Sequence, residues 1–216
     1  MSSIGFVVLC HKSVVVMQSI IEESLSKSYS YSEYRNIVST LLHDGKATGN
    51  EQSEALVHYT ELNETRMKRL EKTIAIAIEN VQKLQQLQND YIWLVLSEGW
   101  CGDAAQILPI IHKMADSTAR IDLKIVFRDA NEELMNLFLT NGTKSIPKLL
   151  ILDKNTLKVL GDFGPRPKGA KQLMLEYKAE HGMIDETAKS NLQLWYFHDK
   201  GASIQQEIMD LMQTLL

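Results

Sequence analysis

The sequence has 216 residues, with 23 basic and 27 acidic side chains and a formal net charge of −4. The length suits one domain of ordinary size with extensions, and a hydrophobic content of 44% is typical of a globular chain. The mildly acidic balance excludes a protein that binds nucleic acid through an overall basic field. Two cysteines in a chain this long argue against a disulfide-stapled secreted protein, so we expect a reducing, cytoplasmic location.

The first sixteen residues fit no standard targeting signal. Their apolar stretches are interrupted by His11 and Lys12 and are too short to span a membrane, so we predict no membrane association. A secretory signal would need a basic leading region and a small-residue cleavage site, and neither is clear. We therefore expect residues 1–16, including Cys10, to be an extension without a catalytic role, and Met17 is an alternative translation start. A weak signal or anchor is the other interpretation.

Residues 17–90 show apolar side chains at three- and four-residue steps, which predicts an N-terminal helical extension. We expect a short helix over 17–27 and a second one that begins at Ser32 as its N-cap. A long amphipathic helix should follow over 51–88, with a break near 59–63.

One face of this long helix is basic, and it carries Arg66, Lys68, Arg69 and Lys72. Four charges on one helix do not make a nucleic-acid site. We favour a solvated face, and a docking patch for an acidic partner is the alternative.

The hydrophobic period then changes to that of buried strands alternating with helices. The predicted order is strand, helix, strand, helix, two hairpin strands and a closing helix, at residues 91–96, 104–115, 121–127, 131–140, 149–152, 157–160 and 168–181. Two further helices are expected at 186–198 and 203–215. We thus divide the chain into a leader (1–16), a helical extension (17–90), an α/β domain (91–181) and C-terminal helices (182–216) that pack on the extension.

Cys101 lies where the first strand pattern hands over to a helical pattern. A thiol at that junction faces unsatisfied backbone N–H groups and the positive end of the helix dipole, which lower a cysteine pKa. Asp103 falls in the first helical turn and should act in the opposite direction. Gly102 should leave the backbone beside the sulfur open to a partner chain.

Two motifs carry a family resemblance. The segment Trp100-Cys101-Gly102 followed by two residues resembles the thioredoxin active-site motif Trp-Cys-Gly-Pro-Cys. The segment 145–152 resembles the thioredoxin stretch that carries a cis-proline facing the active-site sulfur. The resemblance covers about residues 91–181, and the flanks are similar to a bacterial branch of thioredoxin-like proteins with helical extensions.

The resemblance implies an α/β thioredoxin-like fold, with a central mixed sheet flanked by helices. It implies that Cys101 is the catalytic thiol and that Pro147 is the cis-proline. The substrate groove would then be formed by Trp100, Gly102, Asp103, Ile146, Pro147, Gly164 and Arg166. Arg166 between two prolines would favour the thiolate or hold a carboxylate of a small thiol, and a solvent-facing arginine is the alternative.

Two departures from the thioredoxin pattern put the usual chemistry in doubt. Ala104 replaces the second cysteine, and Val95 replaces the buried acid that assists proton transfer. An internal dithiol–disulfide cycle through Cys101 and its immediate neighbours is therefore excluded.

Two functions remain open. The first is a monothiol thiol–disulfide oxidoreductase that acts through Cys101 on a protein or low-molecular-weight disulfide, with an external resolving thiol. The second is a non-catalytic protein-binding module. The histidine and cysteine spacing suits no metal site, and we expect no cofactor.

Overall fold

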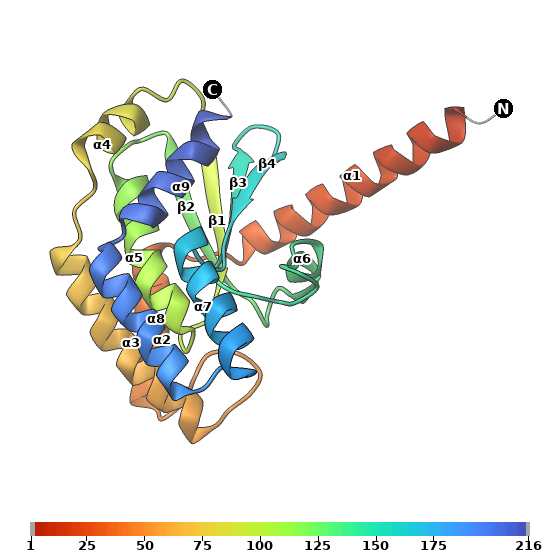
Figure 1. The fold of residues 1–216 in the computed structure, drawn as a ribbon. Coiled ribbons are helices and arrows are strands. Elements are labelled where there is room, and N and C mark those ends of the chain that lie inside the picture. The colour runs from red at the N-terminus through yellow and green to blue at the C-terminus, as the bar shows by residue number, and fades with distance from the viewer. Residues whose placement is uncertain (1–2, 215–216) are drawn as a thin grey trace.

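The protein is a mixed four-stranded sheet surrounded by helices (Figure 1). The computed structural model describes residues 3–214, with side chains from residue 15 onward. In chain order the elements are α1 (Ser3–Ser26), α2 (Tyr31–His43), α3 (Glu54–Thr73), α4 (Ile78–Gln85), β1 (Tyr91–Ser97), α5 (Gly102–Asp116), β2 (Ile121–Phe127), α6 (Glu132–Leu137), β3 (Lys148–Asp153), β4 (Val159–Phe163), α7 (Lys168–His181), α8 (Glu186–Asp199) and α9 (Ala202–Gln213). The predicted α/β fold class with helical extensions is confirmed.

The sheet has the strand order β2-β1-β3-β4. β1 pairs in parallel with β2 and antiparallel with β3, and β3 pairs antiparallel with β4. Every residue of β1 is buried, which explains its unbroken apolar sequence: a central strand covered on both faces has no solvent side. A short loop of three residues, 98–100, separates Cys101 from the carboxyl end of this central strand.

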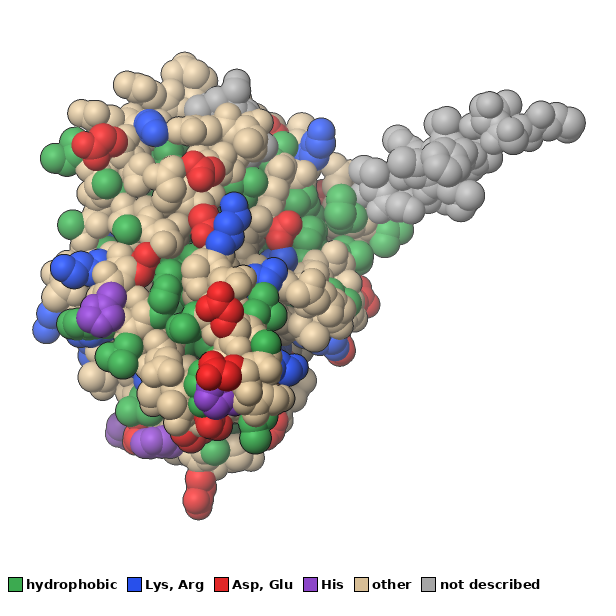
Figure 2. Space-filling model, viewed as in Figure 1, with side chains coloured by type: hydrophobic (Ala, Val, Ile, Leu, Met, Phe, Trp, Pro, Cys, Tyr) green, Lys and Arg blue, Asp and Glu red, His purple; other side chains and the backbone are tan. Residues whose placement is uncertain are grey.

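α3 of the N-terminal segment and the C-terminal helices α8 and α9 lie on the same side of the sheet (Figure 1). α5 packs on α3, β2 and α9, and α9 also contacts β4. Figure 1 shows α3, α5, α8 and α9 together to the left of the strands, with α1 and α6 to the right. Figure 2 shows acidic and basic side chains interspersed over the visible face. Among the described residues, no helix is both long and apolar enough to cross a bilayer.

The N-terminal helix is longer than expected. α1 runs from Ser3 to Ser26, so the backbone is helical well before the predicted start at Met17. The side chain of Cys10 lies outside the described residues. After α1, Tyr29 forms an isolated antiparallel bridge with Ile125 of β2, with both backbone N–O distances at 2.8 Å. This one-residue pairing stands at the outer edge of β2.

The second helix begins earlier than predicted. Ser30, rather than Ser32, is the N-cap of α2. Its hydroxyl accepts from the backbone N–H of Glu33, and the Glu33 carboxylate accepts in return from the Ser30 N–H, which forms a capping box. A cap that satisfies two backbone donors is favoured over the single side chain of Ser32.

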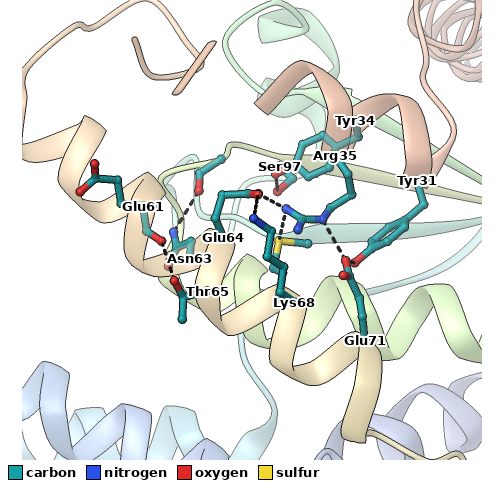
Figure 3. Close-up of polar contacts among 12 residues, drawn as sticks. Tyr31, Tyr34, Arg35, Glu61, Asn63, Glu64, Thr65, Lys68, Glu71 and Ser97 are labelled. Carbon is teal, nitrogen blue, oxygen red and sulfur yellow. Dashed lines mark hydrogen bonds and ion pairs between the residues drawn. The ribbon is translucent and has the colours of Figure 1, made fainter. Parts of the chain in front are cut away.

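A charged network joins α2 to α3 (Figure 3). Arg35 of α2 donates from Nε to Glu71 at 2.9 Å and pairs through Nη1 with the nearly buried Glu64. Tyr31 donates its hydroxyl to Glu71 at 2.8 Å. Further along α3, Asn63 donates to the backbone carbonyl of Gly99 at 2.9 Å. The network therefore fixes α3 beside the loop that leads to Cys101.

The break in the long predicted helix is at 74–77, between α3 and α4, and the expected break near 59–63 is wrong. The backbone groups exposed by the break find side-chain partners. Lys113 of α5 donates to the Ile74 carbonyl at 2.6 Å. Gln205 of α9 accepts from the Ala77 N–H at 2.9 Å and donates to the Ala75 carbonyl at 3.1 Å. These tertiary contacts are distant in sequence, so the local pattern could not locate the break.

We expect the Gln205→Ala substitution to lower the free energy of unfolding by about 2 kcal/mol, because it removes the partners of backbone groups at the break. Urea unfolding at neutral pH measures the change. Gln206→Ala is the matched control, because Gln206 is exposed and bonds only to Asp210 one turn away. Equal effects of the two substitutions would contradict this role of Gln205.

The hairpin, α6 and the C-terminal helices keep the predicted order with shifted ends. β4 spans Val159–Phe163, later than the expected 157–160, because Leu157 adopts a positive φ of 56° and belongs to the turn. The predicted helix over 131–140 is reduced to α6. α8 contacts α7, and α9 contacts α5 and β4.

Candidate functional site

Cys101 is the N-cap residue of α5. Its Sγ accepts from the backbone N–H of Ala104 at 3.4 Å, and its thiol donates to the backbone carbonyl of Ile146 at 3.3 Å. The side chain is buried, with 7% of its surface exposed. The helix N-terminus therefore contacts the sulfur as expected from the sequence, but in an environment closed to water.

The expected low thiol pKa is wrong. Burial, followed by the charge of Asp103, raises the pKa of the Cys101 thiol to about 12. The N–H groups of Asp103 and Ala104 and the charge of Arg166 act in the lowering direction but are the smaller effects. Desolvation overcomes the helix terminus here, because a thiolate with 7% exposure loses most of its hydration.

Asp103 is the centre of a polar cluster beside the thiol. Arg166 forms a two-pronged contact with its carboxylate, at 3.0 Å from Nε and 2.8 Å from Nη2. The hydroxyl of Tyr196, on α8, donates to the same carboxylate at 2.9 Å. The guanidinium of Arg166 is thus engaged by Asp103 rather than open to a carboxylate ligand.

Gly102 faces side chains from the helical extensions. A Cβ at this position would lie 3.7 Å from Nε2 of Gln193 on α8 and 3.9 Å from Nη1 of Arg66 on α3. The backbone beside the sulfur was expected to be open to a partner chain. In the structure, α3 and α8 occupy that approach.

The loop before β3 closes the site from another side. The Ile146–Pro147 and Gly164–Pro165 peptide bonds are both cis. Gly164 has a φ of 126°, and a Cβ there would lie 2.2 Å from the carbonyl oxygen of Pro147. Only glycine fits this contact. Ile146 is buried, and its carbonyl already accepts from Cys101.

Trp100 is directed toward the segment after α2. Its indole Nε1 donates to the carbonyl of Thr48 at 3.0 Å, and the guanidinium of Arg128 lies 4.9 Å from the ring centroid. The Thr48 hydroxyl accepts from the Gly99 N–H at 2.8 Å. These contacts hold the loop before Cys101 in place.

Glu98 is a buried acid three residues before Cys101. Its side chain has no exposed surface, Oε1 accepts from the Asp129 N–H at 3.0 Å, and Oε2 has no hydrogen-bond partner among the described residues. Burial, with a smaller effect from Asp129, raises the pKa of Glu98 above its ordinary value. For an acid whose pKa is raised in the folded state, the free energy of unfolding falls as the pH rises from the unfolded-state pKa to the folded-state pKa.

We expect Glu98→Gln to raise the free energy of unfolding near neutral pH by roughly 1 kcal/mol, because an amide carries no charge to desolvate and can donate to the neighbouring carboxylate. Below pH about 4 the difference should disappear, since Glu98 is then protonated in both states. Chemical unfolding at both pH values measures it. Glu132→Gln is the control, because the Glu132 side chain is 65% exposed. Destabilisation by Glu98→Gln at neutral pH would contradict the desolvation argument.

The sequence prediction missed Tyr196 and Gln193. Both lie on α8, far from Cys101 in the chain, and contact Asp103 and Gly102 in the fold. The only sequence signal was the position of Tyr196 within the helical pattern predicted over 186–198. Within the described part of the chain, no group of three or more His, Cys, Asp or Glu side chains is placed to hold a metal ion.

The central strand β1 pairs in parallel with β2 and antiparallel with β3, and it leads into the cysteine-capped helix α5. This arrangement is that of a thioredoxin-like fold. The sequence model of a family described as thioredoxin matches residues 49–185, which is more than half of the chain. The chain therefore belongs to this thioredoxin family, and the resemblance read from the sequence is confirmed at the level of the family.

Two solved structures resemble the chain. One is the crystal structure of an HIV epitope-scaffold, with a TM-score of 0.53 and 18% identity, covering 86% of this chain and 99% of that one. The other is a protein of unknown function, PA1234, from Pseudomonas aeruginosa, with a TM-score of 0.46 and 22% identity, covering 83% and 99%. At these identities the first likeness concerns the fold alone. No curated protein matches the chain.

Proposed function

We propose that this protein is a non-catalytic thioredoxin-fold module that binds a protein partner, and that Cys101 is held as a neutral thiol inside it. The observation that carries the proposal is the environment of the sulfur: it is 7% exposed, and its thiol pKa is raised to about 12. At pH 7 such a group is ionised to roughly one part in 10⁵. The thiolate, rather than the thiol, is the nucleophile in disulfide exchange.

The hydrogen bonds around the sulfur support the same conclusion. The thiol proton is donated to the Ile146 carbonyl, a bond that only the neutral form can make. Ala104 supplies no second sulfur, and Cys101 is the one cysteine whose side chain the structure describes. The helices α3 and α8 cover the approach to Gly102, through the side chains of Arg66 and Gln193.

The test is disulfide exchange with a glutathione-mixed-disulfide peptide and with a protein disulfide. We compare two proteins: the Cys10→Ser variant, which keeps Cys101, and the double variant Cys10→Ser with Cys101→Ser. We expect both to give the same background rate of exchange. Because Cys101 is then the one remaining cysteine of the sequence, a faster rate in the protein that keeps Cys101 overturns the proposal.

A second function rests on where the cover comes from. Tyr196 belongs to α8 and Arg166 to the loop before α7, so the groups over Asp103 lie on elements that follow the sheet in sequence. If α8 moved away, Cys101 would gain access to solvent at the start of α5. The protein would then be a monothiol thiol–disulfide oxidoreductase with a closed resting state.

The chemistry of that alternative balances with an external thiol. The Cys101 thiolate attacks one sulfur of a protein or low-molecular-weight disulfide, a mixed disulfide forms, and the other sulfur leaves as a thiolate. Because Ala104 supplies no second thiol, an external thiolate then attacks the substrate sulfur of the mixed disulfide. It forms a new disulfide with that sulfur, and Cys101 leaves as the thiolate. Tyr196→Phe distinguishes the two functions: it should speed Cys101-dependent exchange if α8 is a gate and leave the background rate unchanged if Cys101 is inert.

A further inference from the structure

A groove runs between α3 and α8, with α5 below it. It encloses about 610 Å³. Its lining residues come from these three helices and are Thr65, Arg66, Arg69, Gln106, Ser190, Gln193, Leu194 and Phe197. Gln106 of α5 donates to Gln193 of α8 at 2.7 Å and forms a polar base.

The α3 wall of the groove is basic. Arg66 is half-buried and donates from Nη1 to the Asn63 amide oxygen at 2.8 Å. Neither Arg66 nor Arg69 pairs with a carboxylate of any residue from 15 to 214. Burial and the neighbouring charge of Arg69 lower the pKa of Arg66. Two adjacent guanidinium groups that lack a counter-charge favour an anionic ligand, since they match carboxylates in shape and charge.

The α8 wall is apolar and exposed. Leu194 and Phe197 keep 56% and 55% of their surface accessible. With Ser190 and Gln193 they follow the three- and four-residue spacing of one helix face. The Arg69 guanidinium lies 5.8 Å from the Phe197 ring centroid, so charge and apolar surface meet in the groove. Figure 2 shows blue and green side chains next to one another on the left, where α3 and α8 lie in Figure 1.

We propose that this groove binds a short amphipathic helix of a partner protein, with its acidic side chains on Arg66 and Arg69 and its apolar side chains on Leu194 and Phe197. The proposal rests on the binding function above and names its partner chemistry. Helix-in-groove recognition needs an open channel with an apolar wall, and charge complementarity sets orientation and specificity. The combination favours an acidic helix over a small anion, which would leave the apolar wall exposed.

The groove also reaches the Cys101 loop. Arg66 and Gln193 line the groove, and they are the side chains closest to Gly102. A helix bound there lies against the loop that contains Cys101 without touching the buried sulfur. Binding should therefore be the same in the presence and absence of reductant.

The test uses fluorescence anisotropy with a labelled helical peptide that carries glutamate on one face and leucine on the other. We expect saturable binding that weakens as salt is added. The double variant Arg66→Glu and Arg69→Glu should weaken it at least about tenfold, since each reversal places like charges together. Leu194→Ser with Phe197→Ser should weaken it by a similar factor.

The matched control reverses two exposed lysines on other helices, Lys83→Glu and Lys178→Glu, and should leave the affinity unchanged. A peptide with lysine in place of glutamate should not bind. The proposed occupant would be overturned if the peptide did not bind, or if the control variant weakened binding as much as the groove variants do. It would also be overturned if the protein self-associated and this association prevented the peptide from binding. Because Cys101 takes no part, such a failure leaves the proposed neutral thiol to be judged by its own exchange assay.

Discussion

Cys101 of the folded protein should react with iodoacetamide about a thousand times more slowly at neutral pH than the same thiol in the denatured chain. The reason is the thiolate fraction. A thiol pKa of about 12 in the folded state, against an ordinary value of 9.0, leaves about three orders of magnitude less thiolate. The buried position of the sulfur can only slow the reaction further.

The measurement is alkylation rate against pH, followed by mass spectrometry in a Cys10→Ser background, so that only Cys101 is labelled. The rate should rise about tenfold per pH unit from neutral to pH about 10 without a plateau. A plateau at or below pH about 8 would mean a thiolate that the present geometry does not allow, and it would restore the monothiol oxidoreductase as the better function.

The same pKa predicts a stability change at alkaline pH. A group whose pKa is raised in the folded state makes its full contribution to the free energy of unfolding below its unfolded-state pKa. That contribution is lost as the pH rises toward the folded-state pKa. For Cys101 that window lies between 9.0 and about 12. Part of the alkaline loss of stability should therefore be absent in Cys101→Ala, which has no group to ionise.

The sheet of this protein was readable from the sequence because each strand carries a local signal. β1 is an apolar run that is buried throughout, and Cys101 lies at the start of the helix that follows, as predicted. The order of strands and helices from β1 to α7 follows the hydrophobic period alone. The motif around Cys101 pointed to the same family that the comparison with family models supports.

The state of the sulfur was not readable, because it depends on residues far away in the chain. A helix N-terminus lowers the pKa of a thiol, but here burial raises the pKa of Cys101 by more. In the same region, α8 and the 164–166 loop bring Tyr196 and Arg166 over Asp103. Nothing in the sequence near Cys101 records that packing. Arg166 acts on the thiol in the expected direction, but it is also the partner of the Asp103 carboxylate, which opposes ionisation of the thiol.

Arg166→Ala should lower the free energy of unfolding by about 3 kcal/mol, which corresponds to a fall in melting temperature of roughly 6–12 °C for a chain of this size. Asp103 is 10% exposed in its side chain and would keep only the Tyr196 hydroxyl as a side-chain partner. A buried carboxylate that loses its counter-charge destabilises the folded state by about 3–5 kcal/mol. Because the Arg166 side chain is 31% exposed, we expect the loss to lie at the lower end of this range. Calorimetry or urea unfolding measures the loss.

Arg120→Ala is the matched control for this ion pair. Arg120 contacts Asp90 at 3.0 Å, but both side chains are nearly half exposed, so its loss should cost under about 0.5 kcal/mol. Equal costs for the two substitutions would show that the Asp103–Arg166 pair is not the structural tie proposed here.

The thiol supplies a second readout that instability alone cannot imitate. Arg166→Ala removes a charge that lowers the pKa of Cys101, so alkylation of the folded protein should become slower still. Asp103→Asn breaks the same pair and should cost similar stability, yet it removes a charge that raises the pKa and should speed alkylation. Opposite changes in thiol reactivity with parallel losses of stability follow only if Asp103 and Arg166 act on the sulfur through their charges. Changes in the same direction would mean that both substitutions merely open the site.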